Sequence, residues 1–188
     1  YVSAHLYTAE AIRRAVECGV HSLEHCNLIT PEVAALAAKA GAVAVPTLVT
    51  YDKLASDGPR LGLPAESIAK IDDVRLKGLE SLSIMKKAGL TMAYGSDLLG
   101  AMHVYQSEEF TIRGRVLAAQ EVIASATHIA AKLCRMEGRI GVIAPGAHAD
   151  LIAVDGDPLK DLSLLTGQGR HMPLIMRGGA VVKRKALA

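Results

Sequence analysis

Four polar residues each stand at the end of an apolar segment between residues 1 and 97: His5, His25, Thr47 and Asp97. Two imidazoles and a carboxylate form a ligand set suited to zinc or a related divalent cation. Such a cation activates a bound water and polarises a carbonyl group, while a neighbouring carboxylate can accept and return a proton. Each residue alone is more commonly structural, but three such groups at successive segment ends favour a site for metal-assisted hydrolysis.

The elements that must position these residues alternate between short strands and helices. We expect strands at 1–5, 20–25, 42–49 and 90–97, and helices over 9–19, 31–41, 65–87 and 119–134. Thr30 followed by Pro31 is typical of a helix start, because the hydroxyl caps free N–H groups and proline suits the first helical position. Strands and helices that alternate with short connections predict parallel strands joined by right-handed crossovers.

The character of the sequence changes near residue 139. The segment that follows is rich in turn formers, and residues 173–185 read as two strands around Gly178 and Gly179, which is a hairpin signal. We therefore expect an α/β body over residues 1–139 and part of a small β domain over residues 140–188.

Composition excludes several classes of function. The net charge of +2 and an aromatic content of 3% argue against nucleic acid as a partner, because neither a phosphate-binding surface nor a stacking platform is available. No apolar run approaches the roughly 18 residues of a membrane span. Three cysteines without a CxxC spacing predict neither a disulfide framework nor a four-cysteine zinc site. The default compartment for such a chain is the cytoplasm.

Spacing supports a shared site for the two histidines. His5 and His25 are twenty residues apart, which is one strand-plus-helix unit, so adjacent strands would carry them. In a (β/α)8 barrel the carboxyl ends of the strands converge on one mouth, where catalytic residues lie.

The sequence resembles the amidohydrolase superfamily in four stretches that occur in a fixed order: AHLYTAEAIRRAVECGVHSLEHCNLIT, VPTLVTYD, GSDLLGAMHVYQSEEF and GVIAPGAHADLIAVDGDPLKD. Within it, the nearest resemblance is to the metal-dependent carboxypeptidase, Xaa-Pro dipeptidase and imidazolonepropionase-like group. The resemblance implies an α/β fold class: the C-terminal half of a (β/α)8 TIM barrel, strands 5 to 8, with part of a flanking β-sandwich.

The resemblance also implies roles for individual residues. His5 and His25 match the metal-ligand histidines that end the fifth and sixth strands, and Asp97 matches the aspartate of the eighth strand, which binds metal and shuttles the proton. Tyr7 and His103 are the expected substrate contacts. The implied cofactor is a divalent metal, most plausibly zinc, with one or two ions in the intact enzyme.

Other polar residues are weaker candidates. Tyr51 follows the seventh strand and could also meet a substrate. Arg113 and Arg115 could offer a carboxylate fork, although arginines at such a position are usually solvated. Glu24 is expected on the strand face opposite His25, because successive side chains of a strand alternate.

The chain departs from the family in what it lacks. The family's site also needs a His-x-His pair on the first strand and, in binuclear members, a bridging lysine on the fourth, and no His-x-His pair occurs here. A full barrel takes roughly 250 residues. We therefore expect the C-terminal portion of a longer enzyme, inactive alone, whose open strand edge is covered by a missing N-terminal half or by a second copy in a homo-oligomer.

The leading functional hypothesis is a metal-dependent hydrolase that releases the C-terminal residue of a dipeptide or small N-acyl amino acid. A cyclic amidohydrolase of the imidazolonepropionase type, or a deaminase, is the alternative within the class. A non-catalytic module that kept the framework is the alternative outside it. Loops after the first four barrel strands would separate the two enzyme readings, and an upstream His-x-His pair would favour an enzyme over the module.

Overall fold

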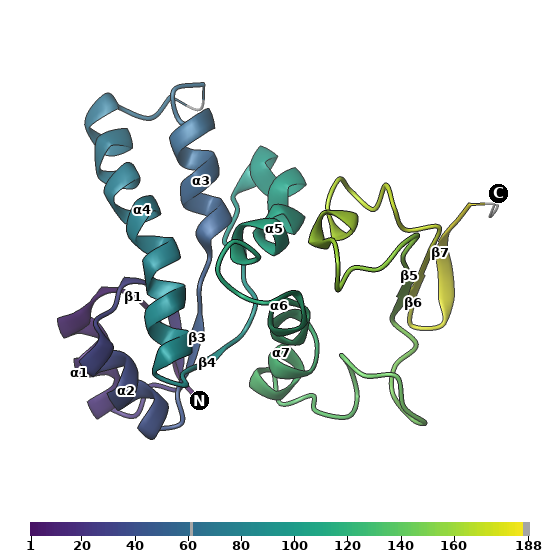
Figure 1. Cartoon of the computed structure of the whole chain (residues 1–188), viewed down its shortest axis with the longest axis horizontal. Coiled ribbons are helices and arrows are strands. Elements are labelled where there is room, and N and C mark those ends of the chain that lie inside the picture. Colours follow the sequence, from purple (N-terminus) through teal and green to yellow (C-terminus); the bar gives the residue numbers. More distant parts are fainter. Residues whose placement is uncertain (61, 186–188) are drawn as a thin grey trace.

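A computed structural model describes residues 1–60 and 62–185 of the chain, which contain two β-sheets and the helices around them (Figure 1). The first sheet is parallel, in the order β1 (Ser3–Thr8), β2 (Ser22–Leu28), β3 (Val43–Val45) and β4 (Thr91–Met92). The second is antiparallel, in the order β5 (Leu151–Ala153), β6 (Leu174–Arg177) and β7 (Ala180–Arg184). The fold class is therefore α/β, with parallel strands as the sequence predicts.

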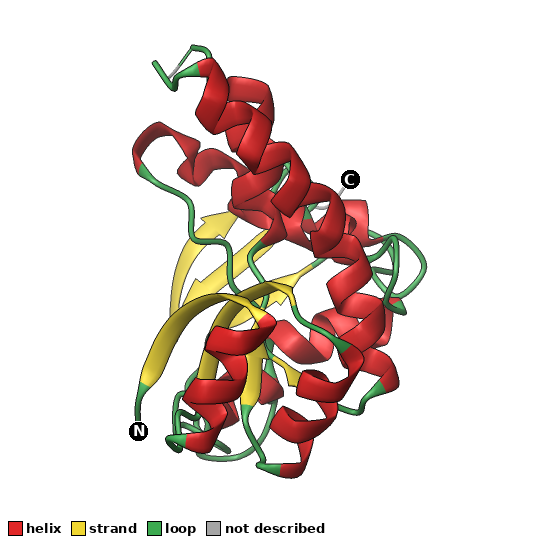
Figure 2. Cartoon of the chain, turned by 90° about the vertical axis from the view of Figure 1, so that its left-hand side faces the viewer, coloured by secondary structure: helices red, strands yellow, loops and turns green. Residues whose placement is uncertain are grey.

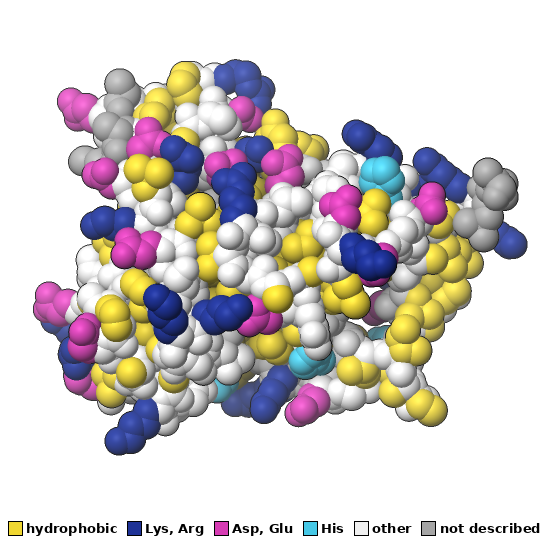
Figure 3. Space-filling view, viewed as in Figure 1, with side chains coloured by type: hydrophobic (Ala, Val, Ile, Leu, Met, Phe, Trp, Pro, Cys, Tyr) yellow, Lys and Arg dark blue, Asp and Glu magenta, His cyan; other side chains and the backbone are white. Residues whose placement is uncertain are grey.

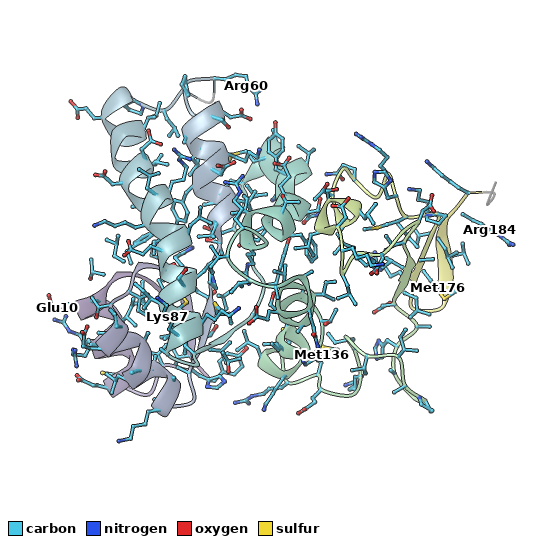
Figure 4. All side chains as sticks on the ribbon, viewed as in Figure 1. Glu10, Arg60, Lys87, Met136, Met176 and Arg184 are labelled. Carbon is cyan, nitrogen blue, oxygen red and sulfur yellow. The ribbon has the colours of Figure 1, made fainter. Side chains whose placement is uncertain are left out.

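Helices connect the parallel strands and continue beyond them. They are α1 (Ala9–Glu17), α2 (Pro31–Lys39), α3 (Leu48–Asp57), α4 (Ala65–Lys87), α5 (Glu109–Arg113), α6 (Ala119–Ala126) and α7 (His128–Leu133), with 3-10 helices η1 (Gly100–Glu108) and η2 (Leu162–Leu165). Figure 2 shows the sheet with helices packed along one side of it. In Figure 1, α3 and α4 rise side by side above the strands, and Figure 4 labels Arg60 in the loop that joins them. None of the helices within the described ranges is long and apolar enough to cross a membrane.

The helices expected to begin at residues 9 and 31 do begin there, as α1 and α2. The Thr8 hydroxyl accepts a hydrogen bond from the Ala11 N–H at 3.3 Å, and the Thr30 hydroxyl accepts one from the Val33 N–H at 3.4 Å. Both contacts satisfy N–H groups that the first turn of a helix leaves free. Apolar faces of α1, α2 and α4 then pack on β2 and β3 in one buried cluster: Ile12, Val16, Leu23, Val33, Ala37, Ala44 and Met85.

Two of the expected strands are shorter than the sequence suggests. The strand expected at 42–49 covers only Val43–Val45, because Pro46 has no N–H to donate to the sheet. The chain then enters α3, a helix that was not expected because its first residues continue the apolar run. The strand expected at 90–97 covers only Thr91–Met92. The N–H of Tyr94 already donates to Ser125 O at 3.0 Å, outside the sheet.

The helix expected over 119–134 is divided into α6 and α7 at Thr127. This residue has φ −120° and ψ −106°, and its hydroxyl donates to Ile123 O at 2.8 Å. Gly141 lies against the same point at φ +71°, where an added Cβ would be 2.6 Å from the Thr127 carbonyl. Only glycine combines this conformation with so close an approach.

The hairpin expected at the end of the chain is confirmed. β6 and β7 pair as antiparallel strands, and Gly178 and Gly179 join them at φ 54° and 82°, as a two-residue turn with two positive φ values requires. Figure 3 shows hydrophobic side chains gathered over this hairpin, where Val181 and Val182 are exposed. The expected division at residue 139 stays a prediction.

Candidate functional site

His5 and His25 meet on neighbouring strands, as their spacing predicts. The Nδ1 atom of His5 lies 2.8 Å from the Nε2 atom of His25. His5 is exposed, whereas His25 is buried with 3% of its surface accessible. The contact between the two imidazoles therefore joins a buried side chain to a solvent-exposed one.

Neither histidine is the last residue of its strand, because β1 continues to Thr8 and β2 to Leu28. The two strands keep one register up to Leu6, and then β2 accommodates one extra residue before Thr8 pairs with Leu28. His25 has φ 72° at this bulge, a left-handed conformation that is rare for residues other than glycine. Bulges of this kind redirect a side chain, and strained backbone is common at functional sites.

The bulge explains how His25 reaches His5. Glu24 is in register with His5, so these two residues share one face of the sheet, and regular alternation would place His25 on the other face. The left-handed backbone at His25 breaks that alternation. Glu24 therefore does not lie on a separate face as expected, and it accepts hydrogen bonds from the hydroxyls of Ser3 at 2.7 Å and Ser22 at 2.5 Å.

The first turn of α3 contacts several of the candidate residues. We call residues 47–51 the 47–51 turn. The Thr47 hydroxyl lies 2.7 Å from His25 Nδ1, the Thr50 hydroxyl donates to Asp97 O at 2.6 Å, and the Tyr51 hydroxyl donates to the Tyr7 hydroxyl at 2.8 Å. Because one helical turn makes all three contacts, its placement sets the mutual positions of the groups it touches.

A remote carboxylate caps this turn. The Thr47 hydroxyl faces His25 and makes no capping hydrogen bond to the helix. Glu109 Oε2 accepts the Val49 N–H instead, at 2.7 Å, and Glu109 Oε1 accepts from Arg113 Nε at 2.7 Å. Arg113 also donates to Pro46 O at 2.5 Å. The side chains of Glu109 and Arg113 are both fully buried, so the solvated position expected for Arg113 is wrong.

Aromatic rings enclose the histidine pair. The Tyr7 ring stacks on His25 at a centroid distance of 5.2 Å and an angle of 11°, and it meets His5 edge to face at 4.7 Å. Tyr51 lies edge to face against His25 at 6.1 Å. Tyr7, one of the two expected substrate contacts, is therefore part of the histidine site.

Burial controls the electrostatics of the site. Desolvation lowers the pKa of His25, and the neighbouring His5 lowers it further, while Asp97 and Glu24 act in the opposite direction. Burial raises the pKa of Tyr51 far above its usual range, and the hydrogen bond to Tyr7 raises it further. A neutral His25 has one N–H, and donation from Nδ1 to Thr47 leaves the Nε2 lone pair directed toward His5.

Asp97 and His103 lie further out. Asp97 is exposed five positions beyond β4, at φ 48°, and its charge is close enough to raise the pKa of His25. His103 is exposed on η1. Within the described part of the chain, no hydrogen bond joins His103 to His5, Tyr7 or His25.

The donor set fits part of a metal site. The imidazoles of His5 and His25 suit a borderline cation such as zinc once the proton shared by their facing nitrogens is displaced, and Thr47 is the outer partner that a ligating histidine usually has. Across residues 1–60 and 62–185, no group of three or more His, Cys, Asp or Glu side chains is close enough to hold an ion. A catalytic zinc takes three protein ligands, so the described residues bring together only part of such a set.

A cavity lies elsewhere, near the opposite ends of the strands. Its volume is about 530 Å³, and His21, Val43, Thr91 and His128 contribute to its lining. None of the candidate residues borders it. This cavity is therefore separate from the histidine pair.

Sequence reasoning did not find the part played by the 47–51 turn. Thr50 and Tyr51 follow Thr47 by three and four positions, the spacing that places side chains on one face of a helical turn. This signal is readable only once 48–57 is recognised as helical, which the strand expected at 42–49 obscured.

Comparison with known proteins identifies the class of the chain. A sequence model of the amidohydrolase family matches residues 1–181. The chain belongs to this family, as its sequence motifs predict.

Comparison with individual proteins gives more detail than the family match. The ochratoxinase of Aspergillus niger is 29% identical over 184 residues, which cover 97% of this chain and 38% of that protein. A prolidase solved with N-methylphosphonate-L-proline is 50% identical, with a TM-score of 0.94 over 98% of this chain and 45% of the other. A Xaa-Pro dipeptidase with bound methionine is 27% identical, with a TM-score of 0.85 over 97% and 45%. The chain thus spans less than half the length of these relatives.

Proposed function

We propose that this chain is the C-terminal portion of a metal-dependent amidohydrolase that cleaves the amide bond of a dipeptide or small N-acyl amino acid. The substrate class is supported by the prolidase and the Xaa-Pro dipeptidase among its relatives, and amide hydrolysis as a class by the family. In this proposal the substrate ends in a free carboxylate next to the scissile bond.

The observation that carries the proposal is the histidine pair. His5 Nδ1 and His25 Nε2 face each other across 2.8 Å at the open end of adjacent parallel strands, and Thr47 occupies the other nitrogen of His25. These two nitrogens would hold a divalent cation, zinc in this proposal, in place of the proton they share, with Asp97 as a further ligand. When bound, the cation supplies an acidified water and polarises the scissile carbonyl.

The remaining roles fall to this chain's own side chains. Asp97 would accept the proton of the attacking water and return it to the leaving amine, because its exposed carboxylate is close enough to His25 to raise the pKa of that imidazole. Tyr7 would hold the substrate through its hydroxyl. His103, exposed on η1, would contact the substrate from the outer rim.

The rest of the site would come from the missing length. The chain spans 45% of the prolidase, and three protein ligands do not gather within its described residues. We propose that a preceding segment supplies a His-x-His pair, completes a (β/α)8 barrel of which β1 to β4 are the last four strands, and extends the β5–β7 sheet into a β-sandwich. A cytoplasmic location and a homo-oligomeric state remain part of the proposal.

A hydrolysis assay on the intact protein tests the function. Zinc-loaded protein should release free amino acid from N-acyl-L-prolines and X-Pro dipeptides, and chelation should abolish this. His25→Ala should reduce kcat/KM by about a hundredfold or more, since even the loss of an outer partner of a metal ligand costs about 10–100-fold. His148→Ala removes an exposed histidine outside the site and serves as the matched control. Absence of amino acid release from the whole panel, with metal bound, would overturn the proposed substrate class.

A further inference from the structure

Tyr51 is a buried polar group that the proposed reaction leaves without a task. It lies on the first turn of α3 with 6% of its surface accessible, and its hydroxyl donates to the Tyr7 hydroxyl at 2.8 Å. A buried phenol needs a hydrogen-bond partner, since an unsatisfied one costs about 1–3 kcal/mol. Tyr7 is that partner, so the two phenols form one unit.

The direction of this hydrogen bond follows from burial. A buried O–H has to find an acceptor, and the Tyr7 oxygen at 2.8 Å is the partner that the structure shows for the Tyr51 hydroxyl. Tyr7 is only half-buried, so its own proton can be satisfied by solvent or by a ligand. Tyr51 is therefore the donor of this hydrogen bond, and the Tyr7 oxygen is the acceptor.

The consequence for Tyr7 is geometric. Its ring is held by stacking on His25 at 5.2 Å and by the edge contact with His5 at 4.7 Å. A phenol carries one proton, and the side of the Tyr7 oxygen that faces Tyr51 is occupied by an incoming donor. The Tyr7 proton must therefore point away from Tyr51. Tyr7 is only half-buried, so this proton is available at the mouth beside the histidine pair.

We propose that Tyr51 is a positioning residue that fixes Tyr7 as a hydrogen-bond donor and so makes the site specific for substrates with a free carboxylate. The inference rests on the proposed function for the choice of a carboxylate as the acceptor. Successive hydrogen bonds polarise one another, so a phenol that accepts one bond becomes a better donor in the next. An anionic acceptor gains most from this, because hydrogen bonds to charged groups are the stronger ones.

The test compares a carboxylate with its neutral amide. Binding of L-proline and of L-prolinamide to the zinc-loaded intact protein is measured by calorimetry, in wild type, Tyr51→Phe and Tyr7→Phe. Tyr51→Phe should weaken proline binding about fivefold and leave prolinamide within twofold, since one indirect hydrogen bond is removed. Tyr7→Phe should weaken proline binding about tenfold or more, and the double variant should lose less than the product of the two.

A matched control separates positioning from simple structural damage. Tyr105→Phe removes a phenol oxygen that contacts Asp57 at 3.3 Å, and it should leave the proline-to-prolinamide ratio unchanged. Equal weakening of both ligands by Tyr51→Phe would make Tyr51 merely structural and overturn the inference. A wild-type protein that binds proline no better than prolinamide would also overturn it, even if the hydrolysis assay upholds the proposed function. Selective loss of proline binding would uphold it even if no hydrolysis occurs.

Discussion

Glu109 offers the sharpest test of how the site is held in place. Its carboxylate caps the 47–51 turn through the Val49 N–H at 2.7 Å and pairs with Arg113, also at 2.7 Å. Glu109→Gln preserves the shape of the side chain but removes its charge. Arg113 is then left buried, with 0% of its side chain accessible and no counter-charge from Glu109.

The burial of this ion pair sets the expected loss in the free energy of unfolding. Removal of one partner of a buried ion pair costs about 3–5 kcal/mol, because the remaining charge stays desolvated. The pKa of Glu109 is raised, because its burial outweighs Arg113 and the N–H groups of Val49 and Leu48, which lower it. The expected loss applies to an ionised carboxylate, so the experiment also tests the charge state of Glu109.

Equilibrium urea unfolding of the intact protein, extrapolated to water, measures the loss in the free energy of unfolding. We expect a loss of about 3 kcal/mol or more for Glu109→Gln. Glu10→Gln, which breaks an exposed pair with Arg14 at 3.1 Å, should produce no measurable change. A loss below about 1 kcal/mol for Glu109→Gln would refute the reasoning, because it would mean that the carboxyl is already neutral or that Arg113 finds another partner.

The remaining predictions concern single groups. Burial raises the pKa of Cys26 to about 12. Iodoacetamide at pH 7.5 should therefore label the two exposed cysteines and leave Cys26 unlabelled until the protein unfolds. Labelling of Cys26 in the folded protein would contradict its burial. Thr47→Val should weaken zinc binding by about tenfold or more in a competition titration, because His25 loses its outer partner, while Thr47→Ser should retain most of the affinity. Lys86 and the Ala118 N–H lower the pKa of Glu121, so its contribution to stability is present above the unfolded value of about 4.3 and is lost as pH falls through the folded pKa. Urea unfolding from pH 6 to pH 3 should therefore show a shallower acid loss for Glu121→Gln than for wild type, and identical slopes would remove this role.

Local signals in the sequence were sufficient for much of the fold. Thr8 and Thr30 cap the helices that they precede, and the paired glycines at 178 and 179 form the expected hairpin turn. Each of these features is decided by residues within a few positions of it. They could be predicted because the relevant hydrogen bonds are made within the segment itself.

The features that escaped prediction depend on distant partners. The helix α3 follows an apolar run and is capped by Glu109, sixty residues away, so nothing near Leu48 marks its start. The left-handed backbone at His25 arises from the mismatch between β1 and β2, which no single segment contains. Burial of Arg113 depends in the same way on the Pro46 carbonyl, which lies on another element.

The sequence predicted which residue types form the candidate site better than it predicted the contacts between them. The spacing of His5 and His25 placed them on adjacent strands, and they do face each other. The roles of Asp97 and His103 depend on the family resemblance and stay predictions. The contacts of Thr47 and Tyr51 required the folded helix, since side-chain direction at the start of α3 cannot be read from an apolar run.

Metal content per chain tests the central claim most directly. Elemental analysis of the intact protein, after dialysis against metal-free buffer, should find one or two zinc-like ions in wild type and in His148→Ala. His5→Ala and His25→Ala should each lose at least one ion, because their facing nitrogens would hold it. Unchanged metal content in both site variants would contradict the account and leave the histidine pair as a structural hydrogen bond.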